Sequence, residues 1–144
     1  MEITSQIWAQ LHERAVEAMR HAYVPYSGYP VGAAGLGEDG TIYSGCNVEN
    51  SSYGIGLCAE CGMISEFIKS GGKQLVAVAA VNGNGDPVVP CGRCRQLIFE
   101  HGGGRALVAM PAGIMPMTDV LPYGFGPDDL KAVPTATYKE MPRD

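Results

Sequence analysis

The sequence predicts a single α/β domain, residues 1–144, in which helices alternate with the strands of a mixed sheet. Three observations support this prediction. The 144 residues match the size of one ordinary domain. A hairpin pattern over residues 31–46 opens the sheet, and two strand–helix–strand patterns follow it before residue 110. Both of these units are expected to be parallel crossovers, so the sheet should contain parallel and antiparallel strands.

The first elements are a helix and a hairpin. Residues 5–23 are expected to be helical because apolar side chains recur three or four positions apart, and Ser5 is placed to cap the start. Strands are predicted over residues 31–36 and 41–46, because the turn-forming residues Glu38, Asp39 and Gly40 separate two apolar segments.

The rest of the chain is predicted to complete the sheet and its helices. Residues 75–81 are seven consecutive apolar residues, which is the pattern of a strand buried on both faces. The other expected elements are a polar binding loop at 47–57, helices at 59–70 and 92–101, strands at 106–110 and 114–117, and a short helix at 128–133. Residues 134–144 are expected to form a flexible tail.

Composition and charge narrow the classes of partner. The formal net charge is −5, and no run of Lys or Arg forms a basic patch. A protein that holds a nucleic-acid polymer normally needs such a patch, so we expect a small-molecule ligand and no nucleic acid. The sequence contains no secretory signal pattern and no stretch of about 18 apolar residues that could span a membrane. We therefore expect a cytoplasmic protein without a membrane partner.

Two cysteine pairs carry most of the chemical information. Cys58 and Cys61 form one C-x-x-C pair, and Cys91 and Cys94 form the other. In a reducing compartment, cysteines at this spacing indicate metal ligands before disulfides. Each pair falls at a predicted helix start, where free backbone N–H groups and the helix dipole are expected to lower thiol pKa values.

The cysteines allow two interpretations. All four could close a structural zinc site, which would leave no position for chemistry. However, residues 62–90 separate the two pairs, a longer gap than the roughly 15–20 residues of zinc ribbons, and this gap holds a predicted helix and strand. Alternatively, Cys58, Cys91 and Cys94 bind zinc and leave a fourth position for water. Glu60 would then lie within reach of that water as a proton carrier.

Five segments of the sequence resemble, in order and spacing, the small homotetrameric cytidine deaminases. The resemblance extends over about residues 10–130. The segments are 25–34 (PYSGYPVGAA), 45–50 (GCNVEN), 58–60 (CAE), 90–96 (PCGRCRQ) and 121–127 (LPYGFGP). Cys58-x-Glu60 followed by Pro90-Cys91-x-x-Cys94 is the all-cysteine form of the known zinc-deaminase motif.

The resemblance implies a fold, an activity and a set of roles. The fold would be the three-layer fold of cytidine deaminases, a mixed five-stranded sheet with helices on both faces. The activity would be hydrolytic deamination of cytidine and deoxycytidine to uridine and deoxyuridine with release of ammonia, as in pyrimidine salvage. The resemblance implies that Cys58, Cys91 and Cys94 bind zinc and that Glu60 transfers protons. It implies that Asn47 and Glu49 bind the ribose, and that Tyr29 and the backbone at Ala59 bind the base. It also implies a homotetramer in which Phe125 completes the site of a neighbouring subunit.

Two departures from the family pattern change the expectations. Tyr29 stands where the family usually has Phe, and Cys61 stands where most members have an Arg that donates to the zinc-bound sulfurs. Three thiolates with Zn²⁺ carry a net charge of −1, so helix N–H groups, Arg93 or Arg95 are expected to offset it. Cys61 is expected to lie outside the ligand set. Two alternatives stay open: a deaminase of another cytosine nucleoside, such as blasticidin S, and a structural four-cysteine zinc module.

Overall fold

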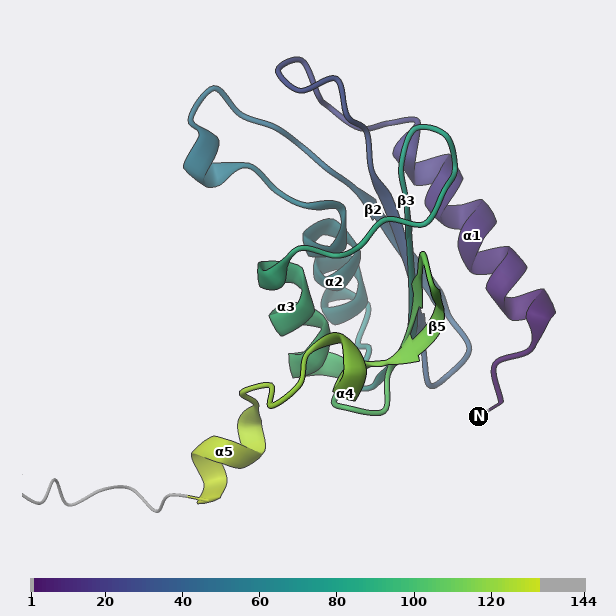
Figure 1. The fold of residues 1–144 in the computed structure, drawn as a ribbon, viewed down its shortest axis with the longest axis vertical. Helices are drawn as coiled ribbons and strands as arrows, with labels where there is room; N and C mark the ends of the chain where they lie inside the picture. The colour runs from purple at the N-terminus through teal and green to yellow at the C-terminus, as the bar shows by residue number, and fades with distance from the viewer. Residues whose placement is uncertain (1, 133–144) are drawn as a thin grey trace, which may run out of the picture.

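A five-stranded mixed sheet separates α1 from the other helices in the computed structural model, which describes residues 2–132 (Figure 1). The strands lie in the order β2-β1-β3-β4-β5. The elements are α1 (Ser5–Met19), β1 (Gly32–Gly37), β2 (Ile42–Cys46), the 3₁₀-helix η1 (Tyr53–Ile55), α2 (Ala59–Lys69), β3 (Leu75–Val81), α3 (Gly92–Gly102), β4 (Leu107–Met110), β5 (Gly113–Pro116), α4 (Met117–Val120) and α5 (Pro127–Ala132). This arrangement confirms the predicted mixed sheet with helices on both faces.

The strand directions place two strand ends at the same edge of the sheet. β1 is antiparallel to both of its neighbours, β2 and β3, so β2 and β3 run in the same direction with β1 between them. β3 and β4 are parallel neighbours, and β5 returns antiparallel to β4. Both predicted crossovers are therefore parallel, and the first of them passes over β1. As a result, the segments that follow β2 and β3 leave the sheet at one common edge.

Helix α1 covers one face of the sheet, but its ends differ from the prediction. Its buried side chains pack on β1 and β3: Leu11 and Ala15 form one apolar cluster with Ala34, Leu36, Ala77, Ala79 and Val81. The cap is Thr4, not Ser5, because the Thr4 hydroxyl accepts a hydrogen bond from the Ile7 amide at 3.2 Å.

The C-terminal end of α1 lies at Met19, four residues before the predicted end at Tyr23. Tyr23 leaves the helix because its backbone pairs with the 47–57 loop. The Tyr23 amide donates to the Asn47 carbonyl at 3.0 Å, and the Glu49 amide donates to the Tyr23 carbonyl at 2.8 Å. This pairing fixes the polar loop against the segment that follows α1.

The second face of the sheet is covered by α2, α3 and α4. Phe67 of α2 is fully buried there and contacts the Tyr43 ring edge-on, with 5.4 Å between the ring centroids. The sequence analysis did not predict α4 or η1. The short helix predicted at 128–133 is α5, Pro127–Ala132, which projects away from the sheet in Figure 1. The predicted tail at 134–144 and residue 133 lie outside the described residues.

No helix within residues 2–132 combines the length and the apolar character that a bilayer span requires.

The predicted strands at 106–110 and 114–117 are each displaced by one residue at one or both ends, to Leu107–Met110 and Gly113–Pro116. Apart from the C-terminal end of α1, the other predicted strands and helices agree with the structure to within about one residue, which is the usual uncertainty of element ends.

Gly45 sets the distance between β2 and α2. Its backbone lies against that of Gly62, where an added Cβ would make an ordinary contact with the Gly45 Cα at 3.5 Å. A Cβ on Gly45 would overlap the Met63 amide nitrogen and would lie 2.6 Å from the Ala59 carbonyl oxygen. Because these are backbone atoms of α2, no side-chain rotation can relieve the overlap. The start of α2 is therefore held against β2 by the absence of a side chain.

We predict that Gly45→Ala destabilises the protein by about 3 kcal/mol, the upper part of the usual range for overpacking. Urea unfolding followed by circular dichroism would measure this change. Gly54→Ala is the matched control, because a Cβ there meets nothing within 4 Å. Equal stability of the two variants would contradict the packing argument.

Candidate active site

Two helix starts bring three sulfurs together. Cys58 is the N-cap of α2, and Cys91 is the N-cap of α3. Their Sγ atoms lie 3.7 Å apart. Cys94, in the first turn of α3, is fully buried, and its sulfur lies within 4.8 Å of both others. Three sulfurs at this spacing are able to hold one metal ion.

Cys61 is not part of this three-sulfur group. Its Sγ accepts from Nη2 of Arg93 at 3.7 Å, and its amide donates to the Cys58 carbonyl at 3.0 Å. Within residues 2–132, the group of possible metal ligands contains Cys58, Cys91 and Cys94 alone. This geometry favours the open three-ligand site over the closed four-thiolate site.

Glu60 follows Cys58 by two positions and points into the protein. Its side chain is 4% exposed, and it is the sole buried charged or polar residue of the described chain. A cavity of about 160 Å³ is lined by Glu60 together with two of the three cysteines, Cys58 and Cys91. The cavity is lined by Val31, Asn47, Cys58, Ala59, Glu60, Val88, Val89 and Cys91. A carboxylate is thus held beside the sulfurs in a mostly apolar space.

The three thiols do not share one electrostatic environment. Burial raises the pKa of Cys58. Burial also raises the pKa of Cys94, and the nearby Glu60 carboxylate raises it further. At Cys91 burial acts in the same direction, but hydrogen bonds with the Cys94 and Arg93 backbone amides and with the neighbouring thiols outweigh it, so the pKa of Cys91 is lowered.

The expectation that helix starts would lower all three thiol pKa values is therefore wrong for Cys58 and Cys94. Their burial and the negative Glu60 carboxylate outweigh the helix termini. For Cys91 the expectation is confirmed, and backbone N–H groups contribute to the shift. Of the three thiols, Cys91 is therefore the one whose environment favours the thiolate form. A bound cation would stabilise all three thiolates together.

Asn47 and Glu49 organise the loops around the cavity. The Asn47 side chain bridges two backbone groups: its Oδ1 accepts from the Val31 amide at 2.8 Å, and its Nδ2 donates to the Tyr29 carbonyl at 3.0 Å. Oε1 of Glu49 accepts from the Tyr26 and Ser27 amides at 3.0 and 3.1 Å. Hydrogen bonds from Ser27 hold the pKa of Glu49 below its usual value, and the bond from the Ser27 side chain has the larger effect.

A second cavity of about 350 Å³ lies at Glu49. It is lined by Tyr26, Ser27, Glu49, Asn50, Tyr53 and Gly56. The 47–57 loop contributes residues to both cavities, and the loop is closed on itself by mutual backbone hydrogen bonds between Val48 and Leu57.

The sequence analysis did not single out four residues that line these cavities: Tyr26, Tyr53, Val88 and Val89. The position of Val88 and Val89 directly before Pro90-Cys91 was the one available signal for them.

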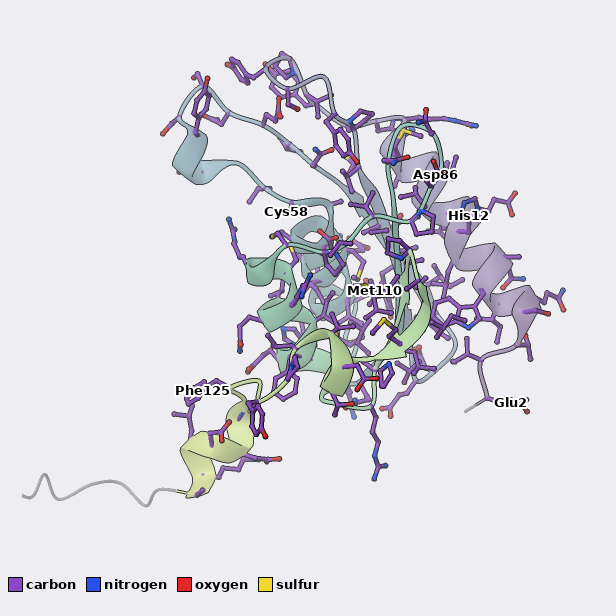
Figure 2. The ribbon with its side chains drawn as sticks, viewed as in Figure 1. Glu2, His12, Cys58, Asp86, Met110 and Phe125 are labelled. Carbon is purple, nitrogen blue, oxygen red and sulfur yellow. The ribbon has the colours of Figure 1, made fainter. Side chains whose placement is uncertain are left out.

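The two predicted aromatic contacts are not formed within one chain. Tyr29 is 52% exposed and lines neither cavity. Phe125 is 58% exposed, and its carbonyl accepts from Nε2 of Gln96 at 2.6 Å. Figure 2 shows Phe125 near the start of α5 and well separated from Cys58. Ala59, in contrast, lies in the wall of the cavity that is also lined by Cys58 and Glu60.

A three-sulfur cluster paired with a buried carboxylate, on a three-layer α/β fold, defines the class of zinc-dependent deaminases. The chain belongs to the family described as the cytidine and deoxycytidylate deaminase zinc-binding region, whose model matches residues 6–110. The resemblance seen in the sequence is thereby confirmed, and so is zinc as the metal of this family.

Several relatives agree with this assignment. The chain is 49% identical over 123 residues to a cytidine deaminase of Mycobacterium tuberculosis, which covers 85% of this chain and 92% of the relative. It is 44% identical over 119 residues to one from Sporosarcina psychrophila, covering 79% and 88%. Among solved structures, the cytidine deaminase of Mycobacterium leprae superposes with a TM-score of 0.79 at 52% identity, covering 80% of this chain and 97% of that one.

We predict that zinc affinity falls steeply as the pH is lowered. Cys58 and Cys94, whose pKa values are raised, must each lose a proton before they bind the ion, so zinc uptake releases protons. The two protons from Cys58 and Cys94 alone correspond to a loss of affinity of at least about 100-fold per pH unit below their pKa values. Competition with a chromophoric chelator between about pH 6 and about pH 8 would measure this dependence, and a flat profile would contradict it.

Proposed function

We propose that this protein is a cytoplasmic cytidine deaminase of pyrimidine salvage. It would hydrolyse cytidine and deoxycytidine to uridine and deoxyuridine and release ammonia. The observation that carries this proposal is the buried Glu60 carboxylate in the same small cavity as the sulfurs of Cys58 and Cys91. Membership of the deaminase family and relatives that are named cytidine deaminases support it.

Cys58, Cys91 and Cys94 would hold the zinc ion. Their donor set fits this metal, because thiolates are preferred zinc ligands and three of them leave one tetrahedral position open. When bound, zinc would supply a Lewis acid that activates water near the carboxylate. Apolar walls at Val31, Val88 and Val89 would limit the access of other water to the reacting ring.

Glu60 would carry protons during the reaction. It would accept a proton from the attacking water, pass it to ring atom N3 and later deliver a proton to the amino group on C4. One water is consumed, a C4–O bond forms, and the C4–N bond breaks to release ammonia. The helical turn between Cys58 and Glu60 keeps the carboxylate at a fixed position relative to the sulfurs.

The substrate would be a nucleoside without a phosphate. The residues that line the two cavities include neither Lys nor Arg, and the Glu49 carboxylate, whose pKa is lowered, stays ionised. A 5′-phosphate would meet this negative charge without a compensating cation, which disfavours deoxycytidylate and nucleic-acid polymers.

Asn47 and Glu49 would bind the ribose hydroxyls. Two backbone amides occupy one Glu49 oxygen, and a carboxylate has about four acceptor positions, so Glu49 keeps capacity for a sugar hydroxyl. The backbone at Ala59 would hold the base, and Tyr29 would lie against the pyrimidine ring. The wall position of Ala59 supports the first of these roles.

The active unit would be a homotetramer in which Phe125 completes the site of a neighbouring subunit. Phe125 is exposed and remote from the sulfurs of its own chain, as a residue that serves another subunit would be. Further large apolar side chains are exposed around it and around the cavities: Tyr26, Tyr29, Tyr53, Ile55, Tyr123 and Leu130. Exposed apolar side chains of this number indicate a covered surface in the assembled protein.

The direct test is loss of cytidine absorbance on mixing with the purified protein, before and after treatment with a strong chelator. We expect turnover that the chelator abolishes and added zinc restores. Cytidine 5′-phosphate and blasticidin S serve as comparison substrates, and both should react far more slowly. If either comparison compound reacted faster than cytidine, that compound would become the assigned substrate in place of cytidine.

We predict that Glu60→Gln retains one zinc per chain and loses turnover. Its kcat should fall by about 10²- to 10⁴-fold, the usual contribution of general acid–base catalysis. Metal analysis and the cytidine assay on the same preparation would separate the two effects. Glu100→Gln, an exposed position on α3, is the matched control and should keep full activity. If the zinc site were only structural, the unsubstituted protein would show no turnover of cytidine, and neither substitution would change it.

A further inference from the structure

An arginine joins the two turns that carry the sulfurs. Arg93 lies two positions after Cys91 and one before Cys94. Its Nη2 donates to the Cys61 Sγ at 3.7 Å, and its Nη1 donates to the Gly56 carbonyl at 3.5 Å. Gly56 and Cys61 lie on either side of Cys58 in the chain. The guanidinium therefore bridges the start of α3 to both flanks of the α2 ligand.

The cluster needs such a cation. Three thiolates with Zn²⁺ carry a net charge of −1, and the Glu60 carboxylate adds a second negative charge beside them. Uncompensated charge of one sign is costly where burial removes solvent, as at Cys94 and Glu60, whereas Cys91 and Arg93 lie at the exposed side of the cluster. The backbone N–H groups that lower the pKa of Cys91 supply only partial positive charges.

Arg95 is directed elsewhere. Its Nε donates to the Pro90 carbonyl at 2.8 Å, and its Nη1 donates to the Val120 carbonyl at 3.1 Å. These contacts tie α3 to the end of α4 and occupy the guanidinium with neutral acceptors. Of the two arginines in the first turns of α3, Arg93 is the one that contacts a sulfur in the C-x-x-C segment of α2.

We infer that Arg93 is a positioning residue for the three-thiolate zinc centre. Its charge offsets the net negative charge of the centre, and Cys61, outside the ligand set, anchors the guanidinium at the rim. The planar fork of Arg can bond to a sulfur and a carbonyl at once, whereas Lys would keep the charge but lose one of these contacts. The inference rests on the zinc site of the proposed function.

The primary test is the zinc dissociation constant of the full-length protein at fixed pH, measured by competition with a chromophoric chelator. Arg93→Gln should weaken zinc binding by about 10- to 100-fold, the usual effect of losing a group that supports metal ligands. Arg93→Lys should recover most of the affinity. Arg105→Gln is the matched control, because Arg105 is exposed just before β4, at the opposite edge of the sheet from the cluster.

Two further readouts distinguish charge compensation from a structural role. The unfolding temperature of the metal-free protein should be the same for Arg93→Gln and Arg105→Gln. With Co²⁺ as the bound metal, the sulfur-to-cobalt charge-transfer band of Arg93→Gln should shift to longer wavelength, because loss of a nearby cation raises the energy of the sulfur electrons. Cys61→Ser should retain one zinc per chain and lose less affinity than Arg93→Gln.

Three results would overturn the inference. Zinc affinity of Arg93→Gln within about twofold of the unsubstituted protein would remove Arg93 from the site and leave the proposed function intact. An equal loss in Arg93→Lys and Arg93→Gln would show that charge is not the reason. If the unsubstituted protein itself bound no zinc, the proposed function would fail together with the inference.

Discussion

The meeting of two helix N-termini at one edge of the sheet is the constraint on which the rest of this structure depends. β2 and β3 run in the same direction, so the helices that follow them both begin at that edge. Cys58 and Cys91 occupy the N-cap positions of these helices, and their sulfurs therefore meet although 32 residues lie between them in the chain, positions 59–90. Ligands at the carboxyl ends of strands are the general rule for sheets with parallel crossovers.

Small residues make this meeting possible. The first strand, Gly-Ala-Ala-Gly-Leu-Gly, has almost no side-chain volume on either face, so α1 and α2 approach it closely. A Cβ on Gly32 would overlap the Ala15 carbonyl of α1, and a Cβ on Gly45 would overlap the backbone of α2. The backbones of α1 and α2 therefore pack directly against the backbone of the sheet at these two glycines. The position of the α2 sulfur therefore depends on packing that lies well away from the metal.

The site is electrostatically unfavourable without its metal. A buried carboxylate and three clustered sulfurs would repel one another if all were ionised. Burial first, and the Glu60 carboxylate in addition, raise the pKa values of Cys58 and Cys94. A divalent cation would offset much of this negative charge, and the backbone amides at the start of α3 stabilise the thiolate form of Cys91. In the proposed mechanism this arrangement gives the buried carboxylate a role, since proton transfer to and from a metal-activated water requires an acid–base group close by.

Local patterns in the sequence were enough to predict the mixed α/β fold, the seven-residue buried strand and the two cysteine pairs that contain the three-sulfur group. Those features depend on apolar periodicity and on short-range spacing, which act within a few residues. The end of α1 was not predictable in this way, because Tyr23 leaves the helix to pair with Asn47 and Glu49, more than 20 residues away. Nor could the sequence decide between Arg93 and Arg95, since the acceptors of the two guanidinium groups lie on other elements. Side-chain identity determined which groups were available for chemistry, and the tertiary contacts between elements distant in the chain decided which of those groups meet.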